Sequence, residues 1–151
     1  MGYFEMEYRK DGNMILARID KDEEILEKIL EICRIENICG AIFSGIGACG
    51  EAVTSSYIPE KNDFTDHAAE GLLELVSLTG NISYENGQPV EHTHALFSYL
   101  DETGTQKILA GHLKKAVVSY TAEIAIEMTK SIIKKKDDTT GIMIWDLTCF
   151  G

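Results

Sequence analysis

Apolar and polar residues alternate over most of the chain, which predicts a series of β-strands. Tyr3 to Arg9 alternates, the pattern breaks at Lys10-Asp11-Gly12-Asn13, and Met14 to Ile19 resumes it. Because Asp-Gly-Asn is typical of tight turns, these segments predict a hairpin. Further turns are predicted at residues 85–89, which contain Asn-Gly, and at 101–105. The remaining predicted strands are 41–44, 52–58, 72–83 (one long strand or two joined at a bend), 90–100, 106–112, 117–128 and 142–147.

One segment instead repeats its apolar residues at helical spacing, from Ile25 to Cys33. Asp20 and Glu23 have the spacing of an N-cap with a capping box, and acidic residues suit the positive end of a helix dipole. We therefore expect one main helix near residues 21–37. One helix among many antiparallel strands is an α+β fold class, and the absence of a linker predicts a single domain over residues 1–151.

The composition is that of a soluble globular protein: 151 residues, of which 44% are hydrophobic and only 2 are proline. No apolar run approaches the ~18 residues that a membrane span needs, and the acidic N-terminus is unlike a signal peptide. We expect a cytoplasmic protein with no membrane contact. Its cysteines form no CxxC pair and are predicted to be mostly buried small hydrophobic residues; they are Cys33, Cys39, Cys49 and Cys149.

The charge balance is strongly acidic, with 25 Asp and Glu against 14 Lys and Arg and a formal net charge of −11. Such a chain repels a DNA duplex unless its basic residues are segregated, because duplex affinity comes from Lys and Arg neutralising phosphates. Its basic clusters are Lys114-Lys115 and Lys134-Lys135-Lys136, and Asp137-Asp138 follows the second directly. We interpret both clusters as solvated ends of strands or loops.

A glycine-rich segment, Gly45-Ile46-Gly47-Ala48-Cys49-Gly50, spells the G-x-G-x-x-G pattern of dinucleotide-binding folds. Glu70 even follows at the distance where such folds carry a ribose-binding acid. That fingerprint requires a helix directly after the glycines, since helix amides bind the pyrophosphate. Residues 51–57 alternate and contain β-branched side chains instead. The segment is therefore interpreted as a bend between strands, where glycines let two backbones approach closely.

Three histidines are predicted to face a common point. His92 and His94 are two residues apart, so on a strand they share a face at roughly 6.5–7 Å. If Leu100 pairs with Gln106 across the 101–105 turn, His94 lies directly opposite His112, with Cβ atoms ~4.5–5.5 Å apart. His92 is then diagonal to His112 on the same face. A slip of one residue would turn His112 to the other face.

Three histidines plus water form the pattern of an open zinc site, so His92, His94 and His112 are candidate metal ligands. Iron, nickel or manganese can use the same ligands, and the alternative is a set of hydrogen-bonded surface histidines. Glu74, within the apolar run 72–76, is a weak candidate for proton transfer; otherwise it faces solvent or another subunit. Glu91 is expected on the opposite face, and the fourth histidine, His67, in a loop or at a strand end.

Motifs spread over nearly the whole chain resemble those of the PPC ("plants and prokaryotes conserved") domain. Gly71 to Ser83, with the sequence GLLELVSLTGNIS, resembles the central signature of its prokaryotic members. The segment Gly45-Ile46-Gly47-Ala48 is similar to the family's glycine turn. His92-Thr93-His94-Ala95 and Gly111-His112-Leu113 are similar to its H-x-H-A and G-H-L motifs, and Val117 and Thr121-Ala122-Glu123-Ile124 continue the pattern.

The resemblance implies an antiparallel α+β domain, assembled as a homotrimer and similar in fold to acetolactate decarboxylase, whose zinc is also held by histidines. It implies that His92, His94 and His112 bind the metal. The family is commonly labelled DNA-binding because its plant members carry an AT-hook beside this domain. This chain contains no Arg-Gly-Arg-Pro hook, and the plant domains lack its histidine set.

Three functions follow as hypotheses. The leading one is a trimeric protein whose divalent metal ion, zinc for preference, is open to a small anionic or carbonyl-bearing ligand. A metal-dependent lyase or hydrolase activity would rest on analogy of fold alone. The alternatives are a DNA-binding or regulatory assembly protein, and an interaction module whose histidines are structural.

Overall fold

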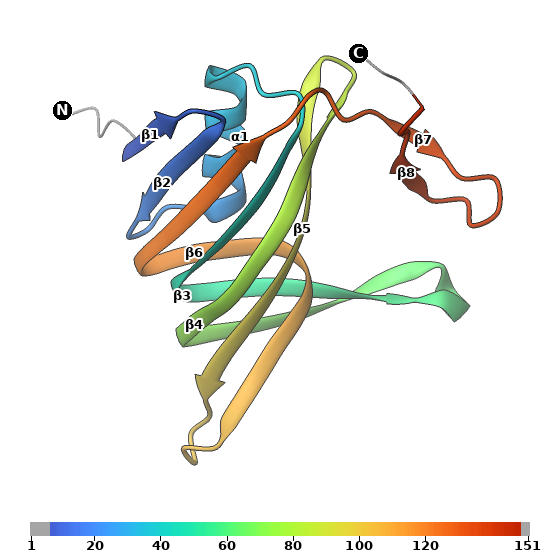
Figure 1. Cartoon of the computed structure of the whole chain (residues 1–151). Coiled ribbons are helices and arrows are strands. Elements are labelled where there is room, and N and C mark those ends of the chain that lie inside the picture. Colours follow the sequence, from blue (N-terminus) through green and yellow to red (C-terminus); the bar gives the residue numbers. More distant parts are fainter. Residues whose placement is uncertain (1–6, 149–151) are drawn as a thin grey trace.

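The computed structural model describes residues 7–148, which form a six-stranded antiparallel sheet, one α-helix and a small C-terminal hairpin (Figure 1). The α+β fold class is therefore confirmed. The strand order is β1-β2-β6-β3-β4-β5, and β5 also pairs with the beginning of β6. The elements are β1 (Glu7–Asp11), β2 (Met14–Asp20), α1 (Ile25–Ile35), β3 (Ala41–Ile58), the 3₁₀ turn η1 (Pro59–Lys61), β4 (Asp63–Glu85), β5 (Gln88–Leu100), β6 (Gln106–Met128), β7 (Lys134–Lys136) and β8 (Met143–Trp145).

Four long strands, β3 to β6, pair in a closed circuit, because β6 pairs with β5 near its start and with β3 over the rest of its length. The β3–β4 hairpin extends beyond this circuit as an arm that ends at η1 (Figure 1). The predicted segments 41–44 and 52–58 are both parts of β3, and 72–83 belongs to the single long strand β4. Likewise, 106–112 and 117–128 are both parts of β6.

The turn chemistry places the hairpins where the sequence predicts them. Gly12 has φ +63 between β1 and β2, and Asn86 and Gly87 have φ +50 and +77 between β4 and β5. In the second turn, positive φ at both central residues matches the right-handed twist of paired strands. The N-terminal part of the first predicted strand, Tyr3 to Met6, lies outside the described residues.

The helix begins later than predicted, at Ile25 rather than near residue 21. The reason is a short bridge to β6: the Asp22 N–H donates to the Val118 carbonyl, and the Val118 N–H donates to the Glu23 carbonyl, both at 2.9 Å. Asp20 is therefore not the N-cap. Glu24 takes that role, because its carboxylate accepts from the Glu27 N–H at 2.8 Å.

The helix packs its apolar stripe on one face of the sheet and forms the core there. Five of its side chains are buried against strand residues such as Phe43 and Phe97. Cys33 and Cys49 are buried as predicted, and burial raises the pKa of each thiol to about 12. Cys39 is only half-buried, and Cys149 lies outside the described residues. The buried helix residues are Ile25, Leu26, Ile29, Ile32 and Cys33.

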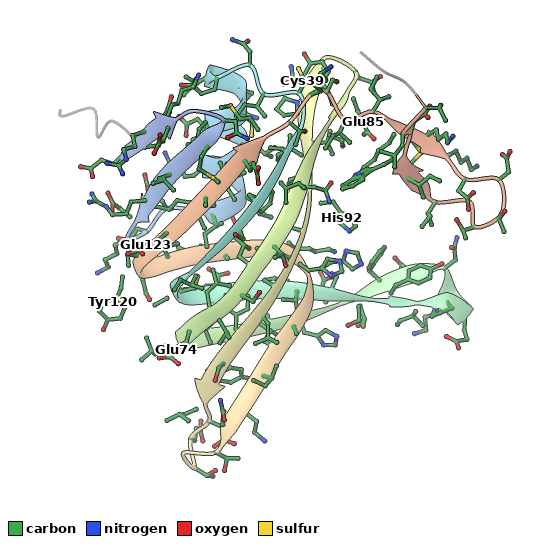
Figure 2. The ribbon with its side chains drawn as sticks, viewed as in Figure 1. Cys39, Glu74, Glu85, His92, Tyr120 and Glu123 are labelled. Carbon is green, nitrogen blue, oxygen red and sulfur yellow. The ribbon has the colours of Figure 1, made fainter. Side chains whose placement is uncertain are left out.

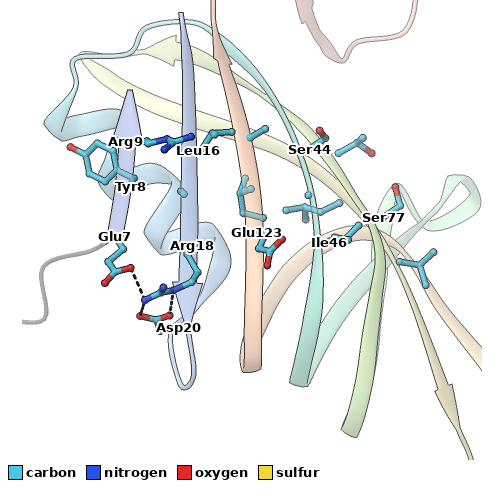
Figure 3. A pocket seen from close by; sticks show the side chains of 17 residues that line it. Glu7, Tyr8, Arg9, Leu16, Arg18, Asp20, Ser44, Ile46, Ser77 and Glu123 are labelled. Carbon is cyan, nitrogen blue, oxygen red and sulfur yellow. Dashed lines mark hydrogen bonds and ion pairs between the residues drawn. The ribbon is translucent and has the colours of Figure 1, made fainter. Parts of the chain in front are cut away.

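The opposite face of the sheet carries no helix and forms a broad groove of about 1410 Å³ (Figure 3). Leu16, Ile46 and Val76 line this groove and are 41%, 59% and 51% exposed. At its rim, Arg18 forms ion pairs with Glu7 and Asp20. The groove therefore mixes exposed apolar side chains with polar and charged ones, among them Glu123, which lies opposite Ile46 (Figure 3).

The glycine motif lies inside β3 and is not followed by a helix. Bulges interrupt the register between Gly45 and Gly47 and between Cys49 and Glu51. A Cβ at Gly47 would lie 2.4 Å from the Thr121 carbonyl oxygen. The predicted close backbone approach is confirmed, and the dinucleotide fingerprint lacks the helix it requires. Among residues 7–148, no helix has the length and apolarity to span a membrane.

Candidate metal centre

The pairing of β5 with β6 is the predicted one. Leu100 lies opposite Gln106, and the same register places His94 opposite His112. A short turn at 101–105 fixes this register, because the Asp101 carboxylate accepts hydrogen bonds from the N–H groups of Thr103 and Thr105.

The three imidazoles converge. Each offers one ring nitrogen, and these atoms all lie within 4.8 Å of one another. Ring centroids are 4.3 Å apart for His94 and His112, and 5.3 Å apart for His92 with either partner. Zinc–nitrogen bonds are about 2.0–2.1 Å long, so two nitrogens on one ion lie at most about 4.2 Å apart, and a small rotation of the rings brings these nitrogens within reach of one ion. The donor set thus fits a divalent metal.

The surroundings of His92 and His112 favour the neutral imidazole, which is the form that binds a metal. Burial lowers the pKa of His92, and His94, Lys134 and His112 lower it further. Burial and then His94 lower the pKa of His112. A metal ion binds the unprotonated ring nitrogen, so protons compete with it for the histidines. A lowered histidine pKa reduces this competition near neutral pH.

A polar group of residues lies beside His112 on the neighbouring strands. Ser55 is opposite both His112 and Asp66, and its hydroxyl donates to the Asp66 carboxylate at 2.5 Å. Lys114 pairs with the same carboxylate at 2.8 Å. Lys114 first and Ser55 next hold the pKa of Asp66 below its usual value. Asp66 is therefore an anion at neutral pH, close to one end of the histidine cluster.

Aromatic residues flank the cluster on two sides. Phe64, from the arm, meets His112 edge-on with ring centroids 5.3 Å apart. On the other side, Trp145 of β8 lines a hollow of about 340 Å³ together with His92 and His94. Figure 2 shows His92 beside β5, between the arm and the C-terminal hairpin. His92 and His94 thus line a shallow, open hollow beside Trp145.

The other candidates do not join this cluster. Glu74 is exposed and lies opposite Ser98, and Figure 2 shows it on a different part of the sheet from His92. His67 is opposite Thr54 in the arm. Glu91 has the opposite orientation from His92, as predicted; burial raises its pKa, and it accepts a hydrogen bond from the Thr93 hydroxyl.

Sequence reasoning missed Ser55, Asp66, Phe64 and Trp145. The first three reach the site through the pairing of β3 with β6 and of β3 with β4. That pairing contains several bulges, so counting along the strands could not give its register. Trp145 lies more than thirty residues beyond His112 in sequence. It is the only tryptophan of the chain, which is the one signal that could have singled it out.

Comparison with known proteins gives one family. The family described as "Plants and Prokaryotes Conserved (PCC) domain" matches residues 6–130. No curated protein matches the sequence.

Several solved structures share the fold. A candidate DNA-binding protein from Bacteroides thetaiotaomicron is 28% identical, with a TM-score of 0.84, covering 95% of this chain and 99% of that one. A metal-containing protein from Archaeoglobus fulgidus is 29% identical, with a TM-score of 0.75, covering 96% and 99%. Alpha-acetolactate decarboxylase from Bacillus subtilis is 14% identical, with a TM-score of 0.54, covering 77% of this chain and 52% of that one. This last likeness concerns the fold alone and confirms the expected similarity of fold.

Proposed function

The chain belongs to the Plants and Prokaryotes Conserved (PCC) domain family, and on this premise we propose that it is a cytoplasmic, trimeric metal-binding protein. His92, His94 and His112 hold one divalent ion, zinc in our proposal, and leave a position open to a small anionic or carbonyl-bearing ligand. The observation that carries the proposal is the convergence of three ring nitrogens within 4.8 Å. A similar protein from Archaeoglobus fulgidus is named as metal-containing, which supports it.

The chemistry of the site follows from its residues. When bound, the ion supplies a Lewis-acidic centre that polarises an oxygen ligand. Partial burial lowers the pKa of His92 and of His112, which favours their neutral form, and the strand register holds His94 opposite His112. Asn81, opposite His92, presents its side-chain amide at the same hollow. Likeness of fold to acetolactate decarboxylase does not transfer a reaction, so the proposal extends to metal and ligand binding.

Metal analysis of the purified protein tests the proposal. We expect close to one zinc ion per chain after dialysis against buffer containing zinc. His92→Ala or His112→Ala should weaken metal binding by about tenfold or more, since each removes one ligand. His67→Ala is the matched control, because this histidine lies in the arm outside the cluster and should leave the metal content unchanged. Wild-type protein without stoichiometric metal, or ligand variants with unchanged content, would contradict the proposal.

Trimer formation is proposed from the family resemblance. Three exposed apolar side chains of the open groove support it, because large apolar residues gathered on an exposed surface commonly mark contacts between chains; they are Leu16, Ile46 and Val76.

DNA binding is the second candidate, favoured by the name of the similar protein from Bacteroides thetaiotaomicron. The charges oppose it: Lys114 pairs with Asp66, and Lys115 pairs with Glu51. In the second basic cluster, Lys135 pairs with Asp146. A mobility-shift titration distinguishes the two functions, since DNA binding would appear at low salt and weaken steeply as salt is added. We expect no shift of a duplex even at low salt.

A further inference from the structure

The C-terminal β7–β8 hairpin lies beyond the family match, which ends at residue 130, yet it is fixed against the histidine site. Ahead of it, the Ile132 carbonyl accepts from the Tyr84 N–H at 2.9 Å, which ties the segment to the end of β4. Within it, the Trp145 indole N–H donates to the Asn81 side-chain oxygen at 3.4 Å. Two contacts with β4 therefore hold the hairpin beside the site.

The hollow beneath this hairpin has a lining without carboxylates, although the chain carries 25 acidic residues. Trp145 forms one wall at 39% exposure, and His92 and His94 form another. Ile42 adds an apolar side chain that is 50% exposed. A volume of about 340 Å³ is at the small end of the range for ligand sites. With a divalent ion on the histidines, the hollow would attract a small anion.

Two further groups favour a negative charge there. Lys134 lies directly opposite Trp145 in the hairpin register, so both side chains belong to the same face. The Asn81 amide nitrogen forms no hydrogen bond within residues 7–148 and remains available as a donor.

The indole adds a preference for shape. Contact between two aromatic rings contributes about 0.5–1.5 kcal/mol of binding free energy in addition to the contribution of the buried area. The upper end of this range corresponds to about tenfold in affinity. Trp145 is partly exposed, and its N–H is already directed at Asn81, which fixes the orientation of the ring.

From this arrangement, and resting on the metal site proposed above, we propose that the hollow takes small flat carboxylates. The carboxylate group faces the histidine cluster, and the flat body lies against the Trp145 indole. Trp145 is thereby a specificity-determining residue and Lys134 a source of charge attraction. Glu91 is adjacent to His92 on β5 and so points to the opposite face, and it is not among the residues that line the hollow.

Calorimetric titration of zinc-loaded protein with benzoate, cyclohexanecarboxylate and acetate tests this proposal, with the metal content measured in every sample. We expect wild type to bind benzoate about tenfold more tightly than either of the other two acids. Trp145→Leu should remove this preference while keeping its metal and its affinity for acetate. Lys134→Gln should weaken all three acids several-fold. The control Ile142→Ala changes an exposed hairpin residue outside the hollow and should behave as wild type.

The single tryptophan gives a second readout. Cobalt added to the metal-free protein should quench Trp145 fluorescence, and the quenching should disappear in His92→Ala and be reversed by chelator. If wild type loads metal but binds the three acids equally or not at all, or if Trp145→Leu keeps the preference for benzoate, this inference is overturned and the metal site stands. If wild type loads no metal, the proposed function fails, and this inference fails with it.

Discussion

Gly111 shows how one backbone position controls the histidine site. It has φ +146, and a Cβ there would lie 2.6 Å from the Ser55 carbonyl oxygen. Because the contact is with backbone, neither partner can move aside cheaply. The absence of a side chain lets β6 approach β3 at the point where His112 lies opposite Ser55.

Gly111→Ala should therefore destabilise the protein and displace His112. We expect a loss of about 1–3 kcal/mol in the free energy of unfolding, from strained backbone and steric overlap. Metal affinity should fall in the same variant, although all three ligands remain. Urea denaturation and a zinc titration measure the two effects. Gly104→Ala is a suitable control, because Gly104 also has a positive φ, of +79, but a Cβ there would have no atom within 4 Å. Equal metal affinity in both variants would refute this role of Gly111.

The histidine pKa values predict how the metal-free protein responds to acid. His92 and His112 have lowered pKa values in the folded state, so between neutral pH and the folded pKa the unfolded chain binds more protons. The stability associated with the neutral histidines is complete above the unfolded pKa of about 6.5 and is lost as pH falls through that value toward the folded pKa. Thermal unfolding in chelator at pH 7.5, 6.5 and 5.5 should show a fall in Tm that is smaller in the double variant His92→Asn, His112→Asn. If Tm falls equally with pH in wild type and in the double variant, these histidines do not contribute to the pH dependence of stability.

At the scale of elements, the local sequence pattern predicts the pairing of two strands correctly where a short turn sets their register. The Asp101–Thr105 turn leaves no freedom in the β5–β6 pairing, so the opposition of His94 and His112 followed from counting residues. The helix start did not follow, because the Glu24 carboxylate accepts from the Ala116 N–H at 2.8 Å, across 92 residues of sequence. No window along the chain contains both partners of such a contact.

This dual role makes Glu24 a sharp test of how α1 is attached. Its two carboxylate oxygens accept from the helix residue Glu27 and from Ala116 on β6, so Glu24→Ala leaves a helix end and a sheet N–H without their partner. We expect a loss of about 2 kcal/mol, the sum of a capping contact and a hydrogen bond to a charged group. Urea denaturation followed by circular dichroism measures it. Glu27→Ala removes an exposed helix carboxylate and should cost far less; equal losses in the two variants would contradict the account.

At the scale of the whole molecule, the helix covers one face of the sheet, and the groove on the other face remains open in a single chain. All three histidines come from β5 and β6 of one chain. The proposed metal site therefore needs no residue from a second chain. The sequence alone could not distinguish a covered from an uncovered sheet face, because exposed residues such as Ile46 and Val76 have the same apolar character as core residues.

Ile46→Glu tests the proposed trimer. Ile46 is 59% exposed in the groove and lies opposite Glu123, so a new carboxylate there would be buried by association beside a like charge. Burial of an unpaired charge is costly, so the variant should run at the 16.8 kDa of one chain in light scattering, while wild type runs at three times that mass. Ile35→Glu, a change of similar exposure on the helix, should stay trimeric. The single-chain Ile46→Glu variant should still bind zinc, since its three ligands remain together. Wild type with the mass of one chain would contradict the proposed trimer. Equal masses for the two variants would contradict the assignment of its contact surface to the groove.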